Sequence, residues 1–281
     1  QLNISQPALG LQIRKLEEHL GIEIFERTKR SVRATPAGER IIERAKTLLA
    51  AARSIEELAT AMTDPLSGSL RLGTIPTIAP YLMPILVPAL AHALPAVEPK
   101  LFERFTKEIE EELVYGSLDA AIIATEPEAP QLTSIPLYDE PFWIALPNGH
   151  ALSREEDIDL GDLAGERLLL LSEGNCLRDQ VLSFYSASKG DPALISTEET
   201  SLTTILALVG GGFGVTLVPA MSLSGPWVTD AGIVVRKETS GAARRGVQLA
   251  FLKSFSRMAL IERLADIIAS IVPDTVAPQR R

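Results

Sequence analysis

A short segment rich in proline, glycine and serine, TDPLSGS at residues 63–69, divides the sequence into two parts with different hydrophobic patterns. Before it, apolar residues recur at steps of three and four, as in amphipathic helices. After it, strand-like apolar runs alternate with helical patterns. This order predicts a helical head followed by an α/β body with parallel sheets.

The second part contains the strand and helix patterns that define this body. We predict strands at the apolar runs LRLGTI, LDAAIIA, FWIALP, RLLLL, GVTLVP and VQLAFL. Helical patterns separate most of them, over residues 80–94, 106–116, 177–188, 200–210 and 256–271. The glycine-rich run GGGFG precedes a strand and lacks the Lys-Ser/Thr ending of a phosphate-binding loop, so we interpret it as a turn.

The first part begins with a predicted helix over residues 5–20. Ser5 is a plausible N-cap, Pro7 lies in the first turn, and Gly21 is placed to end the helix. Its apolar stripe comprises Leu9, Ile13, Leu16 and Leu20. A longer helical pattern follows from Pro36 to Met62, and its apolar positions predict a seam against another long helix.

Charge is distributed unevenly along the chain. The net charge is −9, but residues 1–63 hold ten Lys/Arg against eight Asp/Glu, a net of +2, which leaves −11 for the remainder. The segment RTKRSVR concentrates four of these cations: Arg27, Lys29, Arg30 and Arg33. A basic head on an acidic body indicates that the head contacts an anion.

Several function classes are disfavoured by what the sequence lacks. The one cysteine cannot form an internal disulfide, which fits a reducing cytoplasm. Neither a signal peptide nor an uninterrupted membrane span is visible. No Ser/His/Asp set, metal cluster or cofactor loop is apparent, so we predict neither an enzyme nor a bound cofactor or metal.

The head and the body together resemble a LysR-type transcriptional regulator. The resemblance rests on SQPALGLQIRKLEEHLGIEIFERT, the TPAG turn, the long helix and the α/β body. It implies a winged helix-turn-helix at residues 1–36, incomplete because its first helix is missing, and a linker helix at 37–63 that pairs two subunits. It also implies a regulatory domain at 64–281 with a periplasmic-binding-protein-like fold, its lobe one at 70–142 plus 247–272 and its lobe two at 143–246.

This resemblance also implies partners and DNA-contacting residues. The partners are double-stranded promoter DNA, further copies of the chain in a dimer or tetramer, and RNA polymerase. Residues in the early part of the helix predicted at 5–20 would reach base edges in the major groove. They are Ser5, Gln6, Pro7 and Arg14. The basic segment would form the wing on the phosphates.

Effector binding is expected between the two lobes. Ligands of open α/β sheets bind at the carboxyl ends of strands, and GTIPTIAP follows the first strand of the body. Thr74, Thr77 and Ile78 are therefore candidates for an effector cleft. A small anionic metabolite bound there is one hypothesis for the signal. A solute-binding transport protein is a further possibility, against which the helix-turn-helix head counts.

Cys176 is the second candidate for the sensing site. A lone cysteine is more often an inert apolar side chain than a reactive one. Here, however, it follows Gly174 and Asn175 at an expected helix start, where backbone N–H groups stabilise a thiolate, and Arg178 adds a cation.

CLRDQ and IPTIAPYLMP resemble the peroxide-sensing members of the LysR family. That resemblance implies a redox role for Cys176, with Thr77, Thr106, Asn175, Arg178 and Asp179 around it. Those relatives carry a second cysteine nine residues on, where this chain has Tyr185, and a histidine where it has Asn175. We therefore expect a sensor that forms a sulfenic acid or a mixed disulfide and no internal disulfide.

Overall fold

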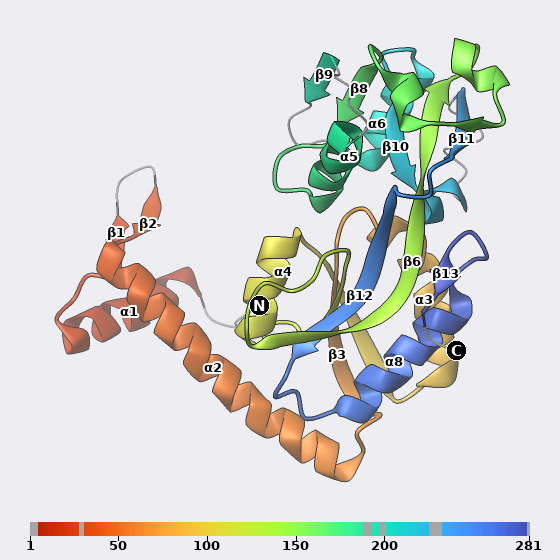
Figure 1. The fold of residues 1–281 in the computed structure, drawn as a ribbon. Coiled ribbons are helices and arrows are strands. Elements are labelled where there is room, and N and C mark those ends of the chain that lie inside the picture. The colour runs from red at the N-terminus through yellow and green to blue at the C-terminus, as the bar shows by residue number, and fades with distance from the viewer. Residues whose placement is uncertain (1–4, 28–30, 188–192, 197–200, 225–231, 280–281) are drawn as a thin grey trace. The chain divides into compact units, whose positions relative to one another are not determined.

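The computed structural model describes residues 5–27, 31–187, 193–196, 201–224 and 232–279. It divides into two compact units, residues 1–55 and 56–281 (Figure 1). The first unit begins with helix α1 and a two-stranded antiparallel sheet. The elements are α1 (Gln6–Leu20), β1 (Phe25–Arg27), β2 (Val32–Ala34) and α2 (Pro36–Thr63), which extends into the second unit.

Local contacts shape the first unit. Ser5 caps α1 by accepting a hydrogen bond from the N–H of Ala8, and Gly21 ends the helix in the left-handed conformation at φ 66°. The carboxylate of Glu17 accepts from the backbone N–H groups of Ile24 (2.8 Å) and Phe25 (3.0 Å), which joins α1 to the base of the β1–β2 hairpin. Gly38 must be glycine, because a Cβ there would lie 2.0 Å from the carbonyl oxygen of Ile24.

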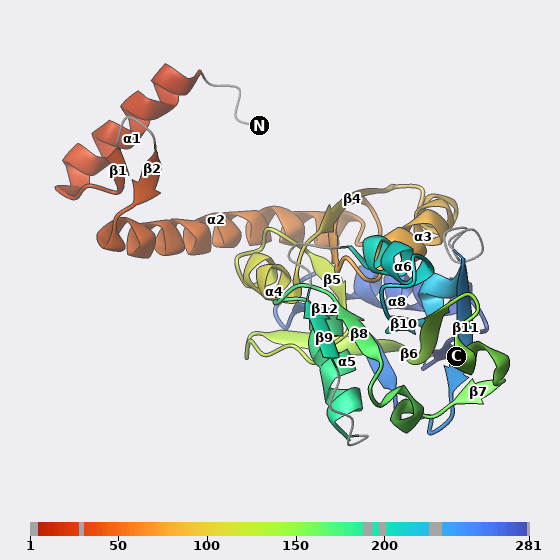
Figure 2. The ribbon, with the colours of Figure 1, turned by 90° about the horizontal axis from the view of Figure 1, so that it is seen from above.

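Lobe one of the second unit is a sheet with helices on both faces. Its strands run in the order β4-β3-β5-β12-β6. Helices α3 and α8 pack together on one face, and α4 covers the other (Figures 1 and 2). The elements are β3 (Gly68–Thr74), α3 (Ala79–Ala93), β4 (Val97–Glu103), α4 (Thr106–Val114), β5 (Ala120–Ile123), β12 (Arg244–Leu252), α8 (Met258–Ile271) and β13 (Ala277–Pro278).

Lobe two is built on the far half of β6 (Leu132–Pro147), which pairs there with β10 and β11. Strands β8 and β9 pair in parallel, and α5 and α6 lie beside them. The elements are β7 (Asp157–Ile158), β8 (Arg167–Leu170), α5 (Cys176–Ala187), β9 (Ala193–Ser196), α6 (Leu202–Gly210), β10 (Thr216–Pro219) and β11 (Ile233–Glu238), with the short 3₁₀ helices η1 (Ala151–Arg154), η2 (Leu160–Leu163) and η3 (Ala220–Ser224).

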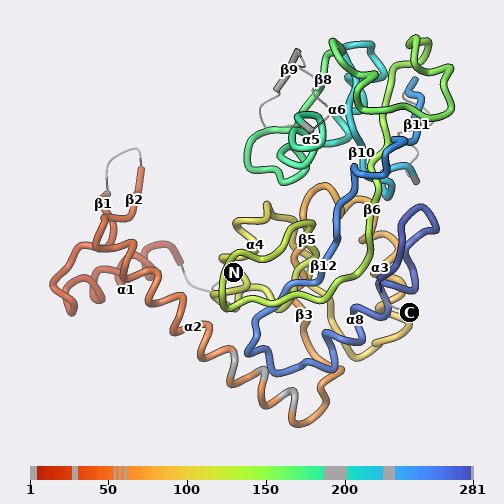
Figure 3. The backbone as a smooth tube through the Cα atoms, in the orientation of Figure 1, coloured from red at the N-terminus to blue at the C-terminus, as the bar shows by residue number. Residues whose placement is uncertain are grey.

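Two chain crossings join the lobes. Strand β6 passes from lobe one into lobe two, and the chain returns at the start of β12, as the tube in Figure 3 shows. The expected lobe boundary at residues 142/143 lies inside β6, and the one at 246/247 lies inside β12. Both strands therefore belong to one continuous hydrogen-bonded path through the sheets.

The expected fold class is confirmed: an α/β regulatory body follows the helix-turn-helix head. The expectation of parallel sheets was only partly right. Strands β3, β4 and β5 are parallel, as are the pairs β8–β9 and β7–β11. Strand β6, by contrast, pairs antiparallel with β10, β11 and β12, and β12 pairs antiparallel with β5. The strands that cross between the lobes run in opposite directions, because one carries the chain out of lobe one and the other brings it back.

The glycine run at residues 210–214 forms the turn between α6 and β10. A Cβ on Gly214 would lie 2.3 Å from the carbonyl oxygen of Arg167, so the close approach of β8 requires glycine there. Within the described ranges, no helix is both long and apolar enough to cross a membrane.

A buried carboxylate joins β3 to the start of β5. The carboxylate of Asp119 accepts from the N–H of Arg71 (2.6 Å) and from its Nε (3.2 Å) and pairs with its guanidinium.

We predict that Asp119→Ala lowers the free energy of unfolding by about 3 kcal/mol, because it leaves the Arg71 cation without its counter-charge. Urea denaturation measures this. Asp157→Ala, at an exposed position on β7, should change it by less than about 0.5 kcal/mol; equal effects would contradict the account.

Candidate functional site

Cys176 is the first residue of α5, and the turn before it places it there. Gly174 adopts φ 84°, which L-residues with side chains rarely adopt. The side-chain oxygen of the buried Asn175 accepts from the N–H of Leu177 (3.1 Å), so Asn175 caps the helix. The half-buried thiol thus lies beside the unpaired N–H groups of a helix start, where negative charge is favoured.

The side chain of Cys176 lines a cavity of about 560 Å³ between α5 and α4. Thr106 and Thr125 line the same cavity, and their hydroxyl oxygens are buried without a hydrogen-bond partner in the described part of the chain. Buried hydroxyls normally have partners, so these two oxygens mark a place where a polar ligand or water fits. Four carboxylates and one ammonium complete the charged lining: Glu110, Glu111, Glu128, Asp179 and Lys107.

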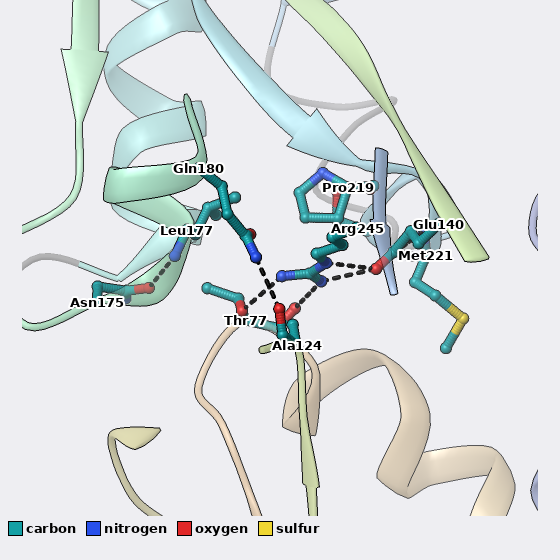
Figure 4. A network of polar contacts seen from close by, with 10 residues as sticks. Thr77, Ala124, Glu140, Asn175, Leu177, Gln180, Pro219, Met221 and Arg245 are labelled. Carbon is teal, nitrogen blue, oxygen red and sulfur yellow. Dashed lines mark hydrogen bonds and ion pairs between the residues drawn. The ribbon is translucent and has the colours of Figure 1, made fainter. Parts of the chain in front are cut away.

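Gln180 connects this site to lobe one. It lies four residues after Cys176, on the same face of α5. Its Nε2 donates to the carbonyl oxygen of Ala124 (2.8 Å), at the end of β5, while its Oε1 is buried with no partner among the described residues. A change at Cys176 is therefore one helical turn away from a direct contact between the lobes (Figure 4).

A buried ion pair lies where β6 and β12 cross between the lobes (Figure 4). Arg245 and Glu140 are 3% and 0% exposed, and Arg245 Nη2 lies 2.7 Å from Glu140 Oε2. Arg245 also donates to the hydroxyl of Thr77 (3.1 Å), and Glu140 accepts from the N–H of Met221 (2.7 Å). Close by, burial raises the pKa of Tyr81 to about 12. The positive charge of Arg245 lowers this pKa, and the negative charge of Glu140 raises it.

The expected redox-site residues have different places. Thr106 and Asp179 line the cavity with Cys176, and Asn175 caps the helix. Arg178 instead directs its guanidinium to the carbonyl oxygen of Leu171 (3.0 Å) and does not line the cavity. Thr77 belongs to the Arg245 network rather than to the cavity wall.

The expected effector residues do not meet at one cavity. Thr74 lines a separate hollow of about 380 Å³ beside α3 and β4. Thr77 is engaged by Arg245, and the side chain of Ile78 is fully buried in the core. Position at the carboxyl end of β3 therefore does not put these three side chains on a shared ligand surface.

Tyr185 occupies the position nine residues after Cys176 and is built into the core. Its ring is 1% exposed, and its hydroxyl donates to the carbonyl oxygen of Leu163. Burial raises the pKa of Tyr185, and the nearby Glu166 raises it further, so the hydroxyl keeps its proton and remains a donor. This bond fastens the last turns of α5 to η2.

The described head residues that are expected to contact DNA lie at or in α1 and in the strands β1 and β2. Gln6 and Pro7 open α1 after the Ser5 cap, and Arg14 and Arg33 are exposed. Arg27 ends β1. Lys29 and Arg30 lie outside the described residues.

Sequence reasoning missed four residues of the site: Thr125, Glu140, Gln180 and Arg245. Gln180 had a detectable signal, because it lies one turn after Cys176 in the same helix. Glu140 and Arg245 are more than a hundred residues apart in the chain, and only the pairing of β6 with β12 brings them together.

Comparisons with known proteins agree with this architecture. Residues 1–39 match the model of the bacterial regulatory helix-turn-helix protein, lysR family, and residues 63–271 match the LysR substrate binding domain. The DNA-binding transcriptional dual regulator OxyR of Escherichia coli K12 is 36% identical over 266 residues, which are 95% of this chain and 87% of that protein. The hydrogen peroxide-inducible genes activator of Pectobacterium carotovorum is 38% identical over 221 residues, 79% of this chain and 73% of that protein.

Solved structures give the same result. A full-length OxyR variant from Pseudomonas aeruginosa matches with a TM-score of 0.78 and 36% identity, over 99% of this chain and 90% of that one. A hydrogen-peroxide-bound OxyR variant from Corynebacterium glutamicum matches with a TM-score of 0.72 and 34% identity, over 96% of this chain and 85% of that one. The chain therefore belongs to the LysR family of bacterial transcriptional regulators, and within that family it resembles the OxyR proteins.

Proposed function

We propose that this protein is a DNA-binding transcription regulator that senses hydrogen peroxide through Cys176 without an intramolecular disulfide. The observation that carries the proposal is the arrangement of Cys176 at a helix start, in a cavity that also holds two buried hydroxyls with no hydrogen-bond partner among the residues that the structure describes. The names of its relatives, peroxide-inducible activators and OxyR, support the same reading.

The chemistry requires a thiolate and a donor for the leaving oxygen. The sulfur of Cys176 attacks one oxygen of the peroxide, the O–O bond breaks, and the other oxygen leaves as hydroxide, which takes a proton to become water. The product is a sulfenic acid. The hydroxyls of Thr106 and Thr125 are suited to hold the peroxide and to donate to the oxygen on which charge develops.

The oxidised sulfur stays in the first turn of α5. Cys176 is the only cysteine, and Tyr185 anchors the position from which a second one would act. The added oxygen must be accommodated between α5 and α4, one turn from the Gln180–Ala124 contact. We propose that this changes the relative position of the lobes and so transmits the signal.

The remaining parts of the proposal concern partners. Ile41, Leu48, Ile55 and Met62 recur every seven residues along α2, and the last three are exposed, so this helix is suited to pair with a second copy. The α1 helix and the wing would then present two copies of the DNA-reading surface to promoter DNA in the cytoplasm, with RNA polymerase as the downstream partner.

An anionic metabolite in the interlobe cavity is the less favoured signal. Glu110, Glu111, Glu128 and Asp179 line that cavity against Lys107 alone, so an anion would meet an excess of negative charge.

Replacing the sensing sulfur tests the proposal directly. We expect Cys176→Ser to abolish the peroxide-dependent change in promoter binding, because an alcohol is not oxidised by peroxide, while basal binding in reductant remains within about twofold of the parent. Footprinting with and without peroxide measures both. A peroxide response in Cys176→Ser equal to that of the parent would overturn the role of Cys176.

Position 185 tests the absence of an internal disulfide. Along a helix, nine residues span about 13 Å, whereas bonded cysteines need Cα atoms within roughly 7 Å. We predict that the oxidised parent keeps the hydrogen-exchange protection of α5. Tyr185→Cys should lose about 3 kcal/mol of stability through the cavity it creates and should form the disulfide only with loss of that protection.

Tyr185→Phe is the matched control for this variant. It keeps the ring and removes the hydroxyl that donates to Leu163, so it should cost about 1 kcal/mol and form no disulfide. Loss of α5 protection in the oxidised parent would show that the helix unwinds without a second cysteine.

Arg30 tests the wing. In the full-length protein, Arg30→Ala should weaken binding to all duplexes alike and reduce the salt slope by about one, because a phosphate contact releases a counterion. Arg263→Ala, on α8 of the regulatory domain, is the control and should leave the slope unchanged. An unchanged slope for Arg30→Ala would remove the wing contact from the account.

A further inference from the structure

We infer that the cavity over Cys176 also binds the thiol that resolves the oxidised sensor, and that it selects a small thiol that carries a protonated amine and no carboxylate. This inference rests on the proposed function, because it concerns the step that follows oxidation of Cys176.

A sulfenic acid at Cys176 needs an external thiol to return it to the reduced state. The chain holds one cysteine, so its sulfenic acid has no internal partner. A thiol RSH attacks the sulfur of the sulfenic acid; the S–O bond breaks, water leaves, and a mixed disulfide forms between RS and Cys176. A second thiol then attacks the outer sulfur, which releases the Cys176 thiolate and the disulfide RSSR.

The volume of the cavity over Cys176 is larger than peroxide alone requires. The cavity measures about 560 Å³, whereas a water molecule occupies about 30 Å³ of liquid and a peroxide molecule is only slightly larger. The cavity instead falls in the range of small-molecule sites, roughly 300–1,000 Å³. Such a volume suits a small-molecule thiol.

The charged side chains that line the cavity favour a cationic ligand. Glu111, Glu128 and Asp179 line the cavity together with Glu110, whose carboxylate is occupied in accepting from the N–H groups of Glu128 and Ala129. Lys107 is the one cation in the lining as described. This excess attracts an ammonium group and repels a carboxylate, so a carboxylate-bearing thiol such as glutathione is disfavoured.

Hydrogen bonding supports the same ligand class. The buried hydroxyl oxygens of Thr106 and Thr125 are open acceptors in the cavity wall. An ammonium or amide N–H of the thiol supplies the donor that these oxygens lack.

The test uses two reagents that label a thiol without any peroxide. The full-length reduced protein is treated with the trimethylammonium and the sulfonate derivatives of ethyl methanethiosulfonate, and labelling of Cys176 is followed by mass spectrometry. The ratio of the two rates cancels the reactivity of Cys176 itself. We expect the ratio of the cationic to the anionic labelling rate to be about tenfold higher at Cys176 than at a free small thiol, because several carboxylates line the same cavity as the sulfur. This excess should shrink in 1 M salt.

Charge variants identify the source of the preference. Glu111→Gln combined with Glu128→Gln should lower the ratio at least threefold, whereas Glu98→Gln, on the exposed edge strand β4, should leave it unchanged. A parent ratio equal to that of the free thiol, or a ratio insensitive to the double variant, overturns the inference.

The resolving step itself is then measured on oxidised protein, in which mass spectrometry shows one added oxygen on Cys176. Cysteamine should form the mixed disulfide faster than mercaptoethanol, and mercaptoethanol faster than mercaptopropionate, after correction for the intrinsic reactivity of each thiol. If the sulfenic acid never forms, the proposed function fails. If it forms but shows no charge order, or reacts only with a thioredoxin-like protein, this inference alone fails.

Discussion

The ion pair between Glu140 and Arg245 lies at the one place where both crossing strands pass between the lobes. Charges this deeply buried are tolerated only when their hydrogen-bonding capacity is used. Arg245 therefore also binds Thr77, which precedes α3 in lobe one, and Glu140 binds the N–H of Met221, which follows β10 in lobe two. One network thus joins elements of both lobes, and removing either charge would leave the other buried and unpaired.

The sensing cavity depends on this network because its walls come from different lobes. Helix α4 belongs to lobe one and α5 to lobe two, so the space between them exists only while the lobes keep their positions. Contacts of its own hold helix α5, among them the Asn175 cap, the Gln180–Ala124 bond and the Tyr185–Leu163 bond. Oxidation of Cys176 acts on the first turn of a helix that is fixed at its middle and near its end.

Sequence patterns predicted the helices and the strands β3, β5, β6, β8, β10 and β12, because these depend on local periodicity. The capped start of α5 was predictable from Gly174 and Asn175, whose roles are local. Strand β4, VEPKLFE, was missed because an exposed edge strand tolerates charges and a proline. The direction of Arg178 was also missed, since a side chain beside a thiol in sequence need not point toward it. Arg245 and Glu140 carried no signal, because their partners are set by long-range strand pairing.

We propose that oxidation of Cys176 to a sulfenic acid is itself the signal. A single peroxide titration measures it most directly, with the intact mass of the protein and transcription from its promoter read from the same samples. The account predicts that the gain of one oxygen on Cys176 and the change in transcription have the same midpoint. A change in transcription while Cys176 remains a free thiol would contradict it.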